Sequence, residues 1–256
     1  MAAVLALATL RPGLEDWREA LLISLYFFFG SSFCFLINDL FDKEKDIAND
    51  KFRPIATGKL SVHNTVIALI FFGIGFLAFG YGLNGSMLIL AMAAIVSFLA
   101  YSPANNKTGL LANVFVAFWA VAPIWEMAFV RSDNEAWWWL LVGLFIMVII
   151  REVLLDWLDV AGDKRVGKPS LPIAVGEKPL KLILTVLMIV GSIFIVYIPW
   201  QVEVSEITYL LFILSVILSW IPFIQLLKVA DRNTIVFNVR FSHVSFIVFV
   251  IALFIR

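Results

Sequence analysis

Charge and cysteine are both scarce in this chain. Of its 256 residues only 15% are charged, and 19 basic residues balance 19 acidic ones to give a net charge of zero. A balanced charge argues against nucleic acid as a partner, because nucleic-acid-binding proteins carry an excess of basic residues. The single cysteine, Cys34, lies in an apolar run. An internal disulfide is therefore excluded.

Histidine is nearly as rare, with His63 and His243 alone. Neither has a second histidine at a ligand spacing, so a transition-metal site is not expected. An EF-hand calcium loop is also excluded, because its ligand spacing and its glycine are missing. The chain has no domain linker and no low-complexity segment. We therefore expect one domain over residues 1–256.

Apolar residues are abundant instead. They make up 62% of the chain, against roughly half in a soluble domain, and the mean hydropathy is +0.98. Because the apolar runs are continuous rather than alternating, they predict membrane-spanning helices and not a barrel. We expect an all-α polytopic bundle with eight full spans of about 20 residues each, near 20–37, 62–83, 86–103, 110–130, 136–155, 181–200, 207–227 and 239–255.

The apolar stretch Ala2–Leu10 is too short to cross a membrane as a helix. We expect it to be a partial N-terminal span. A cleaved signal peptide is the alternative, but the stretch lacks a basic segment before it.

Two acidic clusters follow apolar runs. Asp39, Asp42 and Asp46 stand three and four residues apart, and the same spacing returns in a second cluster, Asp156, Asp159 and Asp163. A helix places residues at such spacings on one face. Ion pairs with neighbouring lysines could explain one cluster alone. Two matching clusters, each where a span ends, instead predict a bound cation.

Carboxylate oxygens suit Mg²⁺, which is usually held by a few carboxylates, water and substrate phosphates. We therefore expect the six aspartates to hold Mg²⁺ and a diphosphate in a shared central cavity. Arg53 could bind phosphate oxygens as a two-pronged fork, and Asn38 could add an amide contact. Point-charge candidates for the same phosphates are Lys107, Lys164, Arg165 and Lys168.

Proline and glycine separate each acidic cluster from the next span. We expect Pro54 and Gly58 to interrupt the first loop, and four residues to interrupt the second: Gly162, Gly167, Pro169 and Pro172.

Basic residues gather in alternate loops, at 38–61, 104–109, 156–181 and 228–240, whereas the loops between them are poor in cations. The positive-inside rule therefore places both acidic clusters on the cytoplasmic side. We expect an integral protein of the cell (plasma) membrane.

These motifs resemble those of the UbiA superfamily of intramembrane prenyltransferases. The first, over 38–61, matches NDxxDxxxD in full, and RPIATG at Arg53–Gly58 is similar to the family's RPIPSG. The second, over 151–173, reads REVLLDWLDVAGDKRVGKPSLPI. It resembles the pattern of an archaeal-type branch, the digeranylgeranylglyceryl-phosphate synthases. Three features depart from the family: there is no RPxN stretch in a first span, Leu155 and Leu158 replace charged residues, and Lys51 replaces a proline.

The resemblance implies a UbiA-like helix bundle around a central cavity, with Mg²⁺ as cofactor. It implies that isoprenyl diphosphate and a membrane-associated acceptor are the partners, in contact with membrane lipid. The implied metal ligands are Asp39, Asp42, Asp46, Asp156, Asp159 and Asp163. The first two residues of each cluster, Asp39, Asp42, Asp156 and Asp159, are implied to be catalytic. The implied substrate-binding residues are Asn38, Arg53, Tyr101, Lys107, Asn113 and Lys164.

The expected activity is transfer of an isoprenyl chain to a glycerol-phosphate hydroxyl through an allylic carbocation. Three alternatives stay open: an aromatic, quinone-type acceptor, a terpene cyclase on the same scaffold, and a lipid-binding relative without catalysis.

Overall fold

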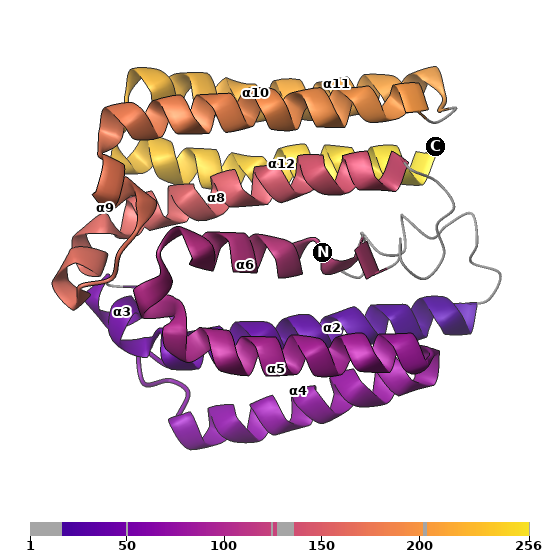
Figure 1. Ribbon diagram of the computed structural model, residues 1–256, viewed down its shortest axis with the longest axis vertical. Coiled ribbons are helices and arrows are strands. Elements are labelled where there is room, and N and C mark those ends of the chain that lie inside the picture. Colours follow the sequence, from indigo (N-terminus) through magenta and orange to yellow (C-terminus); the bar gives the residue numbers. More distant parts are fainter. Residues whose placement is uncertain (1–16, 50, 124, 127–135, 202–203, 256) are drawn as a thin grey trace. The chain divides into compact units, whose positions relative to one another are not determined.

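The computed structural model describes residues 17–49, 51–123, 125–126, 136–201 and 204–255, and all the regular elements in them are helices (Figure 1). Side chains at 103–108, 136–137, 198–201 and 254–255 are outside this description. The helices are α2 (Trp17–Phe41), α3 (Lys43–Ala48), α4 (Val62–Leu83), α5 (Gly85–Thr108), α6 (Leu110–Ala120), α8 (Ala136–Val166), α9 (Leu171–Val175), α10 (Glu177–Gln201), α11 (Glu206–Lys228) and α12 (Arg232–Ile255).

Seven of the described helices are long and apolar enough to cross a membrane: α2, α4, α5, α8, α10, α11 and α12. Each coincides with one predicted run, so the polytopic all-α prediction is confirmed. The eight-span prediction is not matched in number. The described part of the run at 110–130 contains the shorter apolar helix α6 and further helical residues at 122–123 and 125–126, and residues 124 and 127–130 lie outside the described part of the chain. The predicted partial span at Ala2–Leu10 lies outside it too.

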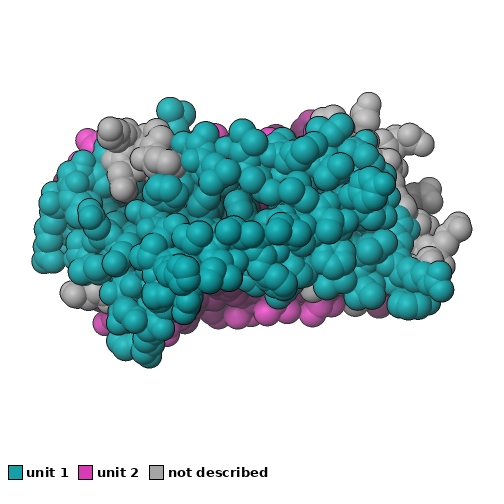
Figure 2. All heavy atoms as spheres, turned by 90° about the horizontal axis from the view of Figure 1, so that it is seen from below, with its two compact units in different colours: residues 1–112, 161–169 teal, residues 113–160, 170–256 magenta. Residues whose placement is uncertain are grey.

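The chain forms two compact units, coloured separately in Figure 2. Unit 1 comprises residues 1–112 and 161–169, and unit 2 comprises residues 113–160 and 170–256. The expected single domain stays a prediction. Unit 1 contains the first acidic motif and residues 161–169 of the second, including Asp163.

Within unit 1, α2 packs against α4 and α5 (Figure 1). The α2–α4 contact is built from aromatic rings on glycines: the ring of Phe76 covers Gly30, and the ring of Phe29 covers Gly75. A Cβ on either glycine would lie within 2.7 Å of ring carbon. Because lipid tails are as apolar as the side chains, such close packing rather than water exclusion holds membrane helices together.

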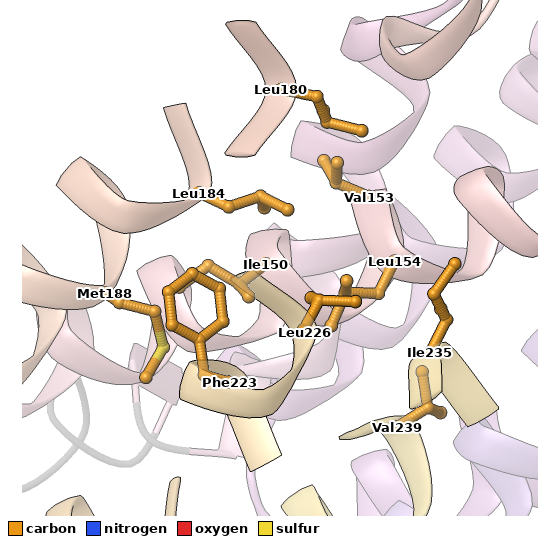
Figure 3. Close-up of a cluster of buried hydrophobic side chains, with 10 residues drawn as sticks. All are labelled: Ile150, Val153, Leu154, Leu180, Leu184, Met188, Phe223, Leu226, Ile235 and Val239. Carbon is orange, nitrogen blue, oxygen red and sulfur yellow. The ribbon is translucent and has the colours of Figure 1, made fainter. Parts of the chain in front are cut away.

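Unit 2 has a buried apolar cluster to which α8, α10, α11 and α12 all contribute (Figure 3). Val153 from α8 and Leu184 from α10 are fully buried there, as are Phe223 and Leu226 from α11. α12 adds Ile235. The cluster fixes the rotation of α8, and therefore the direction in which its aspartates point.

Helix α8 is longer than a bilayer requires. At 31 residues it continues past the apolar run and carries the second acidic motif on its last turns. The expectation that Gly162 interrupts this segment is wrong, because α8 runs on to Val166. The helix ends before Gly167, whose φ of 70° is a left-handed conformation that favours glycine.

We expect Leu184→Ala to destabilise unit 2 strongly, because the loss of the buried leucine would leave a void in the cluster. Substitutions of this kind cost about 2–5 kcal/mol. Thermal unfolding in detergent would measure the loss. Leu182→Ala, on the same helix at a position 66% exposed, is the matched control and should change the unfolding temperature little. Equal losses in both variants would contradict this packing.

Candidate functional site

The first motif lies across a short break between two helices. Asp39 is in the last turn of α2, Asp42 is the residue before α3, and Asp46 is inside α3. Helical hydrogen bonds nevertheless continue across the break, from Asp42 N to Asn38 O and from Asp46 N to Asp42 O, each 2.8 Å long. The predicted helical spacing of the three carboxylates is therefore present in the backbone.

Basic residues of the following loop pair with two of these aspartates. Arg53 Nη1 lies 3.4 Å from Asp39 Oδ1, and Lys51 Nζ lies 3.5 Å from Asp46 Oδ1. The Arg53 side chain is half-exposed. Sequence reasoning assigned Arg53 to phosphate and gave Lys51 no role. Both loop cations therefore lie beside acidic side chains of the first motif.

Asp46 is the most buried carboxylate of the first motif, at 3% exposure. Burial raises the pKa of its carboxyl, and the negative charge of Asp42 raises it further, while Lys51 lowers it by a smaller amount than burial raises it. Ionised Asp46 therefore costs folding free energy, and a bound cation would offset that cost.

Two residues that were predicted to bind substrate, Asn38 and Tyr101, make hydrogen bonds within unit 1. Asn38 Oδ1 accepts a hydrogen bond from Ser102 Oγ at 3.3 Å. Tyr101 donates its hydroxyl to the carbonyl of Ala112 at 3.2 Å, which ties the end of α5 to the start of α6. Both bonds fix the surroundings of the first motif, and a substrate contact of either residue stays a prediction.

In unit 2, Asp156 and Asp159 lie on α8 and are each 6% exposed. Asn113 Nδ2, from α6, donates to Asp156 Oδ2 at 2.9 Å. This bond holds the Asp156 carboxylate in one orientation. Sequence reasoning expected Asn113 in the pocket but not as a partner of Asp156, because 43 residues separate the two.

The end of α8 belongs to unit 1 and is bonded to the first motif there. Gly162 N donates to Asn49 Oδ1 at 3.1 Å, and Arg165 Nη1 donates to the carbonyl of Ala48 at 3.1 Å. Asp163, which directly follows Gly162, is fully buried. Unit 1 therefore contains four of the six predicted metal ligands: Asp39, Asp42, Asp46 and Asp163.

Three further lysines were predicted to contact phosphate: Lys164 in α8, Lys168 just after α8, and Lys107 in α5. Lys164 is exposed on the last turn of α8, whereas Lys168 is only 5% exposed. Lys107 is in α5, but its side chain lies outside the described residues. The sequence did not predict three contacts: Asn49 with Gly162, Lys51 with Asp46, and Ser102 with Asn38. Only the alternation of acidic and basic residues over 39–53 pointed to such pairing.

The donors of both motifs fit Mg²⁺ rather than a softer metal. They are carboxylate oxygens, with an amide oxygen at Asn38. In the described part of the chain, no three or more His, Cys, Asp or Glu side chains gather closely enough to hold a metal on their own.

Part of the chain is similar in sequence to a known protein. A digeranylgeranylglyceryl phosphate synthase from Methanopyrus kandleri is 35% identical over 145 residues, which cover 55% of this chain and 52% of the relative. The matched stretch thus spans about half the length of that relative.

Two solved structures share the fold. A structure described as giving insights into the biosynthesis of digeranylgeranylglyceryl phosphate synthase in membranes has a TM-score of 0.75 and 23% identity, covering 99% of this chain and 90% of the other. A UbiA homologue from Archaeoglobus fulgidus, bound to GPP and Mg²⁺, has a TM-score of 0.69 and 20% identity, covering 97% and 94%.

The helices and the shared fold make this chain an integral membrane protein with multiple apolar helices. The sequence model of the UbiA prenyltransferase family matches residues 1–249 of this chain, which is nearly its whole length. The protein therefore belongs to the UbiA prenyltransferase family.

Proposed function

We propose that this protein transfers an isoprenyl chain from its diphosphate to the hydroxyl of a glycerol-phosphate lipid, forming an ether. The observation that carries the proposal is the first motif, where three helically spaced aspartates meet loop cations that an incoming diphosphate could recruit. Six aspartates would hold Mg²⁺: Asp39, Asp42, Asp46, Asp156, Asp159 and Asp163. When bound, Mg²⁺ supplies positive charge that stabilises the leaving diphosphate.

The loop cations would change partners when substrate binds. Arg53 would leave Asp39 and bind the phosphate oxygens as a two-pronged fork, and Lys51 would release Asp46. Asp39 and Asp46 would then be available to the cation. Asn113 would hold Asp156 in one orientation throughout. Lys107 and Lys164 would add positive charge near the diphosphate.

In the reaction, the bond between the allylic carbon and the diphosphate oxygen breaks, and its electron pair stays on the diphosphate. The acceptor hydroxyl oxygen then bonds to that carbon, and its proton passes to the released diphosphate. Apolar walls supplied by the spans would keep water from the carbocation. The assignment of the acceptor rests on the second motif and on the relative from Methanopyrus kandleri, a digeranylgeranylglyceryl phosphate synthase. An aromatic acceptor or internal cyclisation would use the same aspartates.

The orientation follows from the basic loops. We propose that the first motif and the end of α8 face the cytoplasm of a cell whose plasma membrane the protein spans, since cations gather on that side.

We expect Asp39→Asn and Asp156→Asn each to lower the transfer rate about 100-fold or more, because about 3 kcal/mol of leaving-group stabilisation would be lost. The assay incubates membranes with labelled geranylgeranyl diphosphate and a panel of acceptors, with Mg²⁺ or EDTA. Glu44→Gln, an exposed charge in the same segment, is the control and should keep full activity. Product formed in EDTA, or by both variants at the wild-type rate, would overturn the proposal. Product formed without acceptor would indicate a cyclase.

For Asp46→Asn we expect an unchanged or higher unfolding temperature in EDTA at neutral pH. The pKa of Asp46 is raised in the folded protein, so its ionisation destabilises the fold, and this destabilisation disappears as pH falls below the ordinary carboxyl value. The difference between variant and wild type should shrink accordingly. With Mg²⁺ the wild type should gain stability and the variant should gain less. A variant less stable than wild type in EDTA at pH 7 would contradict this account.

The orientation is testable with single cysteines in a Cys34→Ser background. In intact cells, a membrane-impermeant maleimide should label Ser86→Cys, in the first turn of α5, but not Lys59→Cys, in the loop after the first motif. Both should react once the membrane is permeabilised. The reverse pattern would show that the motifs face outward.

A further inference from the structure

One side chain joins the first acidic motif to the end of the second. The amide of Asn49 is bonded on both sides: Oδ1 accepts from Gly162 N at 3.1 Å, and Nδ2 donates to the carbonyl of Lys45 at 3.2 Å. Asn49 is therefore fixed to the end of α3 and also to α8. The two positions it connects, 49 and 162, are 113 residues apart in the sequence. We name this the 49–162 contact.

The contact requires the absence of a side chain at position 162. A Cβ there would lie 2.1 Å from Asn49 Oδ1 and 2.3 Å from its Cγ, so any other residue would force the Asn49 side chain to move and would break the contact. Glycine inside a helix costs about 1 kcal/mol relative to alanine. Gly162 lies inside α8, four residues before its end, where alanine would be the more favourable residue for the helix alone. The glycine leaves the space that the Asn49 side chain occupies.

The contact lies beside two buried carboxylates. Asn49 follows Asp46 by three residues, and Gly162 directly precedes Asp163. These two aspartates are only 3% and 0% exposed. They come from different helices, α3 and α8, so their relative placement depends on what joins those helices.

We propose that Asn49 is a positioning residue, which sets the register of Asp163 on α8 against Asp46 on α3 so that both can serve one cation-binding site. The inference rests on the proposed function, since it needs the aspartates to be metal ligands. Asn49 itself touches neither cation nor substrate in this role. Residues that orient metal ligands in this way typically change metal affinity or activity about 10–100-fold when removed.

The first test is Asn49→Ala in the full-length protein in detergent, with Mn²⁺ as a paramagnetic probe for the Mg²⁺ site. We expect the Mn²⁺ dissociation constant, measured by electron paramagnetic resonance without substrate, to rise about tenfold. The Mg²⁺ concentration for half-maximal transfer should rise by a similar factor. Asn64→Ala, the same change at an exposed position at the start of α4, is the matched control and should bind Mn²⁺ as the wild type does.

The second test restores the contact by a covalent bond. In a Cys34→Ser background, we combine Asn49→Cys with Gly162→Cys to form a disulfide, because a Cβ at 162 would lie only 2.3 Å from Asn49 Cγ, the atom that a cysteine sulfur at 49 replaces. The reduced protein has lost the Asn49 bonds, and the oxidised protein has the two helices joined again. We expect the oxidised form to bind Mn²⁺ within about threefold of wild type, and the reduced form to bind about tenfold more weakly.

The outcomes separate the two proposals. Wild-type protein without metal-dependent transfer or Mn²⁺ binding would refute the proposed function, and the positioning role with it. Wild-type protein that binds Mn²⁺, together with an Asn49→Ala variant that binds it equally well, would refute the positioning role alone. The positioning role would also be refuted if Asn49→Ala only lowers the unfolding temperature in EDTA, or if oxidised and reduced double-cysteine proteins bind Mn²⁺ alike.

Discussion

The cost of burying carboxylates at the ends of apolar helices governs this structure. Asp46, Asp156, Asp159 and Asp163 are all at most 6% exposed, and an ionised carboxylate in such a place is unfavourable unless a positive charge or a hydrogen-bond donor meets it. The surrounding structure supplies such partners to two of these aspartates, Asp46 and Asp156. Lys51 lies beside Asp46, and Asn113 donates to Asp156. Within each unit, taken by itself, the acids offer the oxygen ligands that a hard cation prefers.

Apolar packing positions the helices that carry the acids, in addition to the polar contacts of Asn49 and Arg165. In unit 1, glycines on α2 and α4 receive aromatic rings of the facing helix, so the two helices approach closely. In unit 2, the apolar cluster fixes the rotation of α8. A rotation of α8 by one residue, about 100°, would turn Asp156 away from Asn113. The orientation of Asp156 therefore depends on apolar contacts of α8 that begin within one helical turn of it, at Leu154 and Val153.

The sequence was sufficient for the features that depend on composition and spacing. Long apolar runs predicted the spans, because a helix that crosses a bilayer must be apolar over a known length. The spacing of Asp39, Asp42 and Asp46 predicted their helical register, which the backbone bonds bear out. Gly162 was misjudged because glycine interrupts helices in general, whereas here a neighbouring side chain takes up the space it leaves. The pairing of Asn113 with Asp156 could not be predicted, since it depends on how α6 and α8 are rotated.

The close approach of Asn49 to Gly162 also limits which substitutions this chain can accept. Neither position can change alone without cost: a side chain at 162 would collide with the asparagine, and loss of the asparagine would leave an unfilled space beside a helix glycine. Substitutions at the two positions should therefore be inherited in pairs, with a small residue at 49 accompanying any residue larger than glycine at 162. Across relatives, this pair would mark which lineages kept the same joint between the two motifs and which replaced it.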